Sequence, residues 1–143
     1  MSDFIPNIII VDLDADIQKQ FDSASDTERS TIAKKYILDN LRSDYMTNDG
    51  LEVIISGKTA RKLAHTLYEP KIRVSPHLGE AIQCGVFEYV KESDKPREDE
   101  FVKFAYYRVY FDIGGKIYSG LLNIGIDKGG RGTLYDINPL LQI

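Results

Sequence analysis

Two long stretches of alternating apolar and polar residues, 101–113 and 116–126, are separated only by the pair Gly114–Gly115. Two glycines in this setting are typical of a tight hairpin turn, because glycine readily adopts the positive φ that such turns require. A two-residue turn also fixes the strand register, so residues whose numbers add up to 229 should face each other, as Phe111 and Tyr118 do. We therefore expect an antiparallel hairpin with one apolar face.

The other face of this hairpin is more polar than a second core face would be. A face of this kind is either exposed to solvent or part of a functional site. A glycine-rich loop, 127–132, then leads to a last strand, 133–137, which makes the C-terminal part an antiparallel meander. The residues predicted on the polar face are Tyr106, Arg108, Tyr110, Ser119 and Asn123.

The N-terminal half shows mainly helical patterns. The run Ile8–Val11 is typical of a buried strand or an apolar anchor, and residues 12–21 form a short predicted helix. Ser25 and Glu28 have the spacing of a capping box, which predicts a helix from there to about Tyr45. The buried stripe expected for this helix contains Ile32, Tyr36, Ile37, Leu41 and Tyr45.

The middle of the chain continues with a strand at 51–56 and a helix at 58–69, whose apolar residues recur every three or four positions. Ser75 followed by Pro76 favours the start of another helix, and 91–100 is a charged connector. The residues that this later helix is expected to bury are Leu78, Ala81, Ile82 and Val86.

These patterns predict the α+β class, with a helical N-terminal half packed on a C-terminal antiparallel β-meander. A length of 143 residues is typical of one domain, so we expect residues 1–143 to form a single domain. The sequence has no apolar run long enough for a membrane helix and no signal-peptide pattern at its start, so we expect a cytoplasmic protein without membrane contact. The single cysteine excludes an internal disulfide and argues against a thiolate zinc site.

The charge is unevenly distributed. Residues 1–55 hold 11 acidic and 5 basic residues, whereas 56–79 hold 1 acidic and 5 basic residues. The basic segment also contains His65, one helical turn from Arg61 and close to Lys62. Such a helix either is an ordinary solvated face or binds a polyanion.

A histidine among cations suits RNA cleavage without a metal ion. The reaction needs a group that accepts the 2′-hydroxyl proton, a group that protonates the leaving oxygen, and cations that hold the phosphate. His65 can act as the acid or the base near neutral pH. Arg108 can hold the phosphate, and Tyr106 can stack a base or donate a proton. The alternative is that both residues have purely structural roles. His65 is then an ordinary surface histidine, and Arg108 forms an ion pair across two strands.

The order of these features resembles the barnase–EndoU–colicin–RelE-like group of phage and mobile-element nucleases, and within it the large polyvalent protein-associated domains. The resemblance lies in the strand Leu51–Ser56 with the helix that follows it, in the strands around Tyr106–Val109 and Lys116–Tyr118, and in the terminal Leu134–Ile137. It implies a ribonuclease-like part at 50–137, after a helical part at 1–49, with RNA cleaved at the sheet.

This resemblance and the basic helix together define the candidate site. Its catalytic residues are His65, Arg108 and Tyr106, and we expect neither a metal nor another cofactor. Thr133 and Tyr135 correspond to hydroxyl residues in the last strands of that group. The candidate substrate-binding residues are Lys58, Arg61, Lys62, Ser119, Thr133 and Tyr135.

Two other functions stay open. The acidic balance of residues 1–55 favours a non-catalytic, phage-derived protein that binds a basic host protein through its N-terminal helices. A small-molecule site over the polar face of the hairpin is the third possibility. The expected partners are thus RNA, or a host or phage protein.

Overall fold

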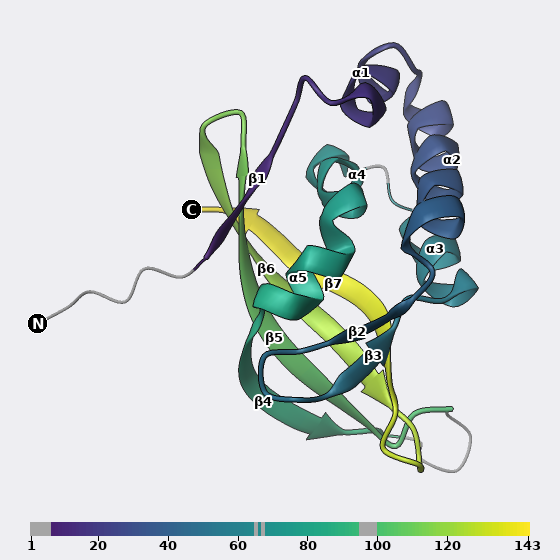
Figure 1. Ribbon diagram of the computed structural model, residues 1–143, viewed down its shortest axis with the longest axis vertical. Helices are drawn as coiled ribbons and strands as arrows, with labels where there is room; N and C mark the ends of the chain where they lie inside the picture. Colours follow the sequence, from purple (N-terminus) through teal and green to yellow (C-terminus); the bar gives the residue numbers. More distant parts are fainter. Residues whose placement is uncertain (1–6, 65, 67, 95–99) are drawn as a thin grey trace, which may run out of the picture.

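The computed structural model describes residues 7–64, 66, 68–94 and 100–143, which fold into helices lying on one curled sheet (Figure 1). The α+β class is therefore shown. The strands are β1 (Ile8–Val11), β2 (Asp44–Met46), β3 (Glu52–Ile54), β4 (Val86–Glu92), β5 (Lys103–Ile113), β6 (Lys116–Ile126) and β7 (Gly132–Gln142). The helices are α1 (Asp16–Asp22), α2 (Asp26–Tyr36), α3 (Gly57–Ala64), α4 (Glu69–Val74) and α5 (Leu78–Cys84).

The hairpin register predicted from the glycine pair is confirmed. β5 and β6 pair antiparallel, with Phe111 opposite Tyr118 and Tyr107 opposite Leu122. Gly114 and Gly115 take φ values of 60° and 83°. This is the left-handed conformation, which residues with a side chain adopt only at a cost. A local turn requirement therefore sets the pairing of the two central strands.

The expected antiparallel meander is present as β5, β6 and β7, but the sheet contains further strands. Its strand order is β1-β5-β6-β7-β3-β2, with β1 parallel to β5 and β3 parallel to β7. β4 also pairs with β5, antiparallel, and so lies on the same edge of β5 as β1. The whole sheet is thus mixed and not purely antiparallel. The added strands β1, β2 and β3 come from the N-terminal half and β4 comes from the segment just before β5, because edges left open by the meander can be paired by other segments.

The long N-terminal helix begins as predicted but ends earlier. Ser25 accepts the backbone N–H of Glu28 and donates its hydroxyl to the Glu28 carboxylate at 2.7 Å. The first contact confirms Ser25 as the N-cap, whereas the Glu28 carboxylate binds the Ser25 hydroxyl and not the backbone N–H that a capping box uses. The helix then loosens into a π-helical turn, Ile37–Leu41. Tyr45 lies in β2 instead of the predicted helix, with its hydroxyl donating to the Leu41 carbonyl.

Of the predicted helix over 58–69, the described residues form α3 up to Ala64, and only Glu69 is helical again, as the first residue of α4. Pro70 stands in the first turn of α4, where its missing N–H costs no helical hydrogen bond. The later helix also stops early, at Cys84. Gly85 is extended, and Val86 starts β4, a strand that the sequence analysis missed.

The sheet has two unlike faces. The core face carries Ala105, Tyr107, Val109 and Phe111 of β5, which pack with residues of α3, α5 and the π-helical turn. The outer face carries the alternate residues Phe104, Tyr106, Arg108 and Tyr110, which are partly exposed. Figure 1 shows the described helices on the core side. Among the described residues, no helix is long and apolar enough to span a membrane.

Candidate functional site

Helix α3 is fixed to the edge of β7 by Thr59. This side chain is fully buried, and its hydroxyl donates to the carbonyl oxygen of Leu134. The Ser56 hydroxyl, just before α3, accepts the N–H of Lys58 at 3.2 Å. Such a contact caps the start of the helix. The anchoring holds the polar face of α3, with Lys58 and Lys62, beside β7.

A cavity of about 280 Å³ lies where α3 meets the edge of β7, with residues of β5 and β7 on its other side; we call it the Lys62 pocket. It combines cations, hydroxyl groups and aromatic rings, which are the groups that bind phosphates and bases in single-stranded nucleic acids. The residues that line it are Lys58, Thr59, Lys62, Glu100, Phe101, Phe104, Thr133, Leu134 and Tyr135.

Three aromatic side chains form one wall of this pocket. The ring centroids of Phe104 and Tyr135 are 5.6 Å apart, and Phe101 contacts both rings. Phe101 lies across Gly125 of β6, where a Cβ atom would come within 2.5 Å of the ring. The absence of a side chain at Gly125 therefore lets the Phe101 ring pack directly on the strand.

The two lysines of the pocket have different partners. The Lys62 ammonium lies 4.4 Å from the centre of the Tyr135 ring and donates to the Tyr135 hydroxyl at 3.4 Å. The first of these distances is typical of a cation–π contact. Lys58 forms an ion pair with Glu100, and both of these side chains are more than half exposed. Since an exposed ion pair contributes little stability, a phosphate can replace Glu100 at Lys58.

Arg108 has its partners within the sheet. It donates from Nε to the Glu88 carboxylate at 2.8 Å and from Nη2 at 3.2 Å, and from Nη1 to the Ser119 hydroxyl at 2.9 Å. The hydrogen bond from Arg108 lowers the pKa of Glu88, and the same bond raises the pKa of Arg108. Glu88 therefore neutralises Arg108, so a phosphate would compete with that carboxylate.

Tyr106 lies on the outer face between Arg108 and the pocket. Its ring stacks on Tyr89 of β4, with the centroids 4.5 Å apart and the planes inclined by 18°. Phe104, two residues earlier on the same strand and the same face, belongs to the pocket wall. Aromatic side chains thus continue from the Lys62 pocket across the outer face to β4.

The structure brings together four of the predicted substrate-binding residues. Lys58, Lys62, Thr133 and Tyr135 all line the Lys62 pocket, although they come from two distant parts of the sequence. The other predicted residues lie elsewhere: Arg61 is exposed on α3 but does not line the pocket, and Arg108, Tyr106 and Ser119 lie further along the outer face. His65 lies outside the described residues.

Sequence reasoning missed several groups of this region. Phe101 and Phe104 were assigned to the hairpin strand without a role, and Glu88 and Glu100 were not considered. The charged stretch before Phe101 was the available signal for Glu100, but nothing local indicated that it faces Lys58. Within the described part of the chain, no group of three or more His, Cys, Asp or Glu residues could hold a metal ion.

Comparison of the chain with protein-family models, with curated proteins and with solved structures finds no match in any of the three. The interpretation of the site therefore depends on its own geometry and chemistry.

Proposed function

We propose that this chain is a ribonuclease-like domain that binds single-stranded RNA at the Lys62 pocket and cleaves it without a metal ion. The observation that carries the proposal is the convergence of Lys58 and Lys62 with the rings of Phe101, Phe104 and Tyr135 around one cavity. Lysines attract the phosphate backbone, while aromatic rings stack bases that are not paired in a duplex.

The order of residues along the outer face supports a single-stranded ligand. A base stacked on Tyr135 would take the place of the Lys62 ammonium over that ring and leave the ammonium free to bind the adjacent phosphate. Phe104 contacts Tyr135, and the Tyr106–Tyr89 stack lies next along the sheet. A duplex keeps its bases stacked on each other, so it cannot use these rings. The net charge of −4 does not prevent binding, because the pocket itself has two lysines and a single carboxylate, Glu100.

Cleavage is proposed on two grounds: the presence of His65 in the basic segment, and the resemblance to the nuclease group. In this mechanism the 2′-oxygen attacks the phosphorus while the bond to the 5′-oxygen breaks. His65 accepts the 2′-hydroxyl proton, water protonates the leaving 5′-oxygen, and the lysines stabilise the growing charge on the phosphate. Arg108 takes part only when the phosphate displaces Glu88 from its guanidinium.

Binding is tested by fluorescence anisotropy with labelled single-stranded RNA, using Lys62→Ala and Tyr135→Ala. Each variant should weaken binding roughly tenfold, since one stacked base contributes about 1–3 kcal/mol and one phosphate contact adds a salt-dependent term. Lys116→Ala and Tyr68→Ala are the matched controls, because both side chains are exposed and neither lines the pocket. Equal affinity of all five proteins would contradict the binding site.

Cleavage is tested on mixed RNA in the presence of a metal chelator, with His65→Ala beside the wild type. We expect fragments ending in a 2′,3′-cyclic phosphate, and a loss of at least about a hundredfold in rate for His65→Ala. Identical traces for the two proteins would remove the catalytic part and leave an RNA-binding domain.

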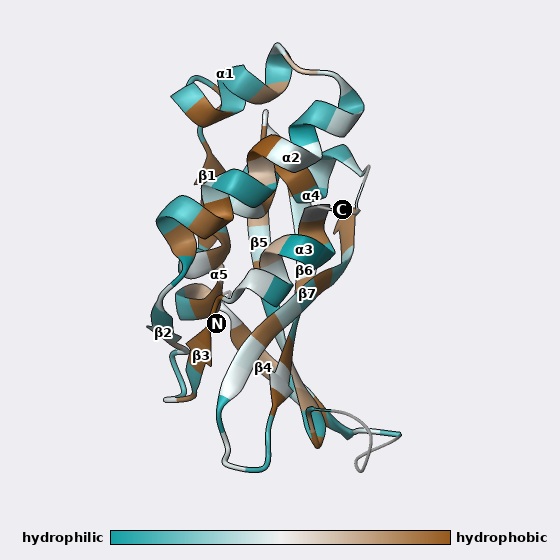
Figure 2. Ribbon diagram, turned by 90° about the vertical axis from the view of Figure 1, so that its right-hand side faces the viewer, coloured by the Kyte–Doolittle hydropathy of each residue, from teal (hydrophilic) through white to brown (hydrophobic). Residues whose placement is uncertain are grey.

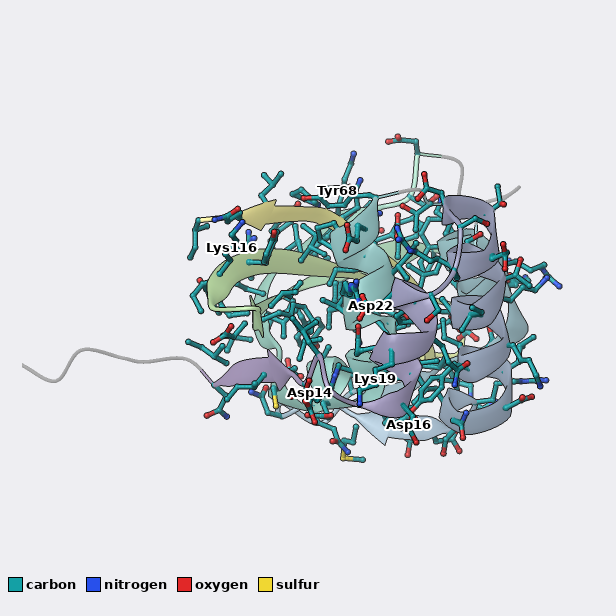
Figure 3. The ribbon with its side chains drawn as sticks, turned by 90° about the horizontal axis from the view of Figure 1, so that it is seen from above. Asp14, Asp16, Lys19, Asp22, Tyr68 and Lys116 are labelled. Atoms are coloured by element: carbon teal, nitrogen blue, oxygen red, sulfur yellow. The ribbon has the colours of Figure 1, made fainter. Side chains whose placement is uncertain are left out.

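A second candidate function is based on the acidic character of the N-terminal region, residues 1–55. Asp12, Asp14 and Asp16 are exposed in this region, and Figure 3 labels Asp14 in the loop before α1 and Asp16 at the start of α1. In this function the chain binds a basic protein without chemistry. Replacing the three aspartates by lysine should then abolish binding to that protein while RNA binding persists.

A further inference from the structure

The end of the outer face far from the Lys62 pocket carries apolar side chains in two adjacent rows. The pairings of β1, β5, β6 and β7 place Ile8, Tyr110, Ser119 and Leu141 in one row. They place Ile10, Asp112 and Ile117 in the next row, which Ile143 joins through its N–H bond to the Ile117 carbonyl. We call these residues the apolar rows.

The exposure of these side chains is unusual. Ile143, Ile10 and Leu141 are 73%, 70% and 59% exposed, the highest values among the large apolar side chains of the described residues. On β1, the two neighbours of Ile10, Ile9 and Val11, are buried in the core. One apolar face of β1 is therefore already packed, and the opposite face is the exposed one. Figure 2 shows β1 as hydrophobic along its length. Exposed apolar patches of this kind are typical of protein interaction sites.

Acidic groups dominate the border of the apolar rows. Asp112 stands within the second row, and Asp12 and Asp14 are exposed on the loop that follows β1. Leu13 of this loop lies against the turn, with its Cδ1 3.4 Å from the position of a Cβ on Gly114. One exposed base, Lys116, follows the turn as the first residue of β6 and is labelled in Figure 3.

We propose that the apolar rows dock a protein segment whose apolar side chains are flanked by lysine or arginine. The apolar contact supplies affinity, and the bases match Asp12, Asp14 and Asp112. RNA does not fit this surface, because its phosphates would face those carboxylates. A second copy would bring the same acidic border against itself, so charge disfavours self-association.

The inference shares no residue with the Lys62 pocket and is independent of the RNA proposal. It deepens the second candidate function, on which it rests, since it adds an apolar surface of the sheet to the acidic loop. The second candidate function and the apolar contact can be tested separately. Substituting the aspartates changes the charge, whereas substituting the apolar side chains changes the apolar contact.

The test uses two labelled helical peptides with the same leucine face, one with lysine and the other with glutamate on its polar face. Binding to the full chain is measured by fluorescence anisotropy. The variants are Ile10→Ser with Leu141→Ser, and Asp12→Asn with Asp14→Asn. Met46→Ser is the control, because Met46 is an exposed apolar residue on β2, outside the rows. Circular dichroism checks that each variant is folded.

We expect the lysine peptide to bind and the glutamate peptide not to bind. The serine pair should weaken binding about tenfold or more, the asparagine pair should weaken it less, and Met46→Ser should leave it unchanged. Loss of binding in the asparagine pair alone would overturn the apolar rows but retain the second candidate function. Equal binding of both peptides, binding of neither, or competition by single-stranded RNA would also overturn the proposal.

Discussion

Tyr106 and Tyr107 are neighbours on β5, yet they belong to different environments. Tyr107 is buried on the core face, and its hydroxyl donates to both carboxylate oxygens of Asp49, at 3.0 and 3.1 Å. Tyr106 is partly exposed on the outer face and contacts the ring of Tyr89. Because side chains alternate along a strand, one sequence position separates a side chain that stabilises the fold from one that is available to a ligand.

The comparison extends to the charged groups of the two faces. The core face is apolar except where a hydrogen bond satisfies a polar group, as Asp49 does for Tyr107. The outer face keeps Arg108 and its partner Glu88 in partial contact with water, and Lys62 of α3 lies over the Tyr135 ring beside it; these partners can be replaced by a ligand. Stability and binding are thus assigned to opposite faces of the same three central strands.

The largest expected effect comes from Phe111→Ala, which removes a fully buried ring from the core face. Large-to-small changes of this kind cost about 3–5 kcal/mol, so the free energy of unfolding should fall by that amount. The control is Tyr110→Ala on the outer face of the same strand, for which we expect less than about 1.5 kcal/mol. Urea unfolding measures both, and equal losses would contradict the division between the faces.

A smaller loss of stability is expected from Gly125→Ala. This substitution tests the division of roles between the core face and the outer face. Gly125 is on the outer face, but a Cβ there would lie 2.5 Å from the Phe101 ring, so the ring has to move. Overpacking of this kind costs about 1–3 kcal/mol. Since Phe101 also walls the Lys62 pocket, RNA affinity should fall together with stability. Gly129→Ala, in the loop after β6, has no close contact with a ring and is the control.

The smallest effect at neutral pH is expected from Tyr107→Phe, at about 1 kcal/mol for the lost hydrogen bond. Burial, together with Asp49, raises the pKa of Tyr107 to about 12. A raised pKa means that the unfolded chain releases this proton first, so the wild type should lose stability as the pH rises from about 10 to about 12. The variant lacks this loss, and urea unfolding across that range measures the difference. Parallel curves would contradict a buried, neutral Tyr107.

Local sequence patterns were sufficient to predict the features that depend on neighbouring residues. The Gly114–Gly115 turn set the β5–β6 register, and Ser25 with Glu28 set the start of α2. The helical period over Lys58 and Lys62 was read correctly up to the end of α3. These features are local because a turn or a cap needs only the conformations and hydrogen bonds of a few adjacent residues.

Tertiary structure decided the features that join distant segments. Nothing near Ile8–Val11 shows that it pairs parallel to β5, and the partner of Arg108 is Glu88 from a strand that sequence reasoning assigned to a helix and a connector. The Lys62 pocket likewise needs α3, the start of β5 and β7 to meet. Such contacts depend on which edges and faces the rest of the chain leaves open, and local sequence patterns do not encode that choice.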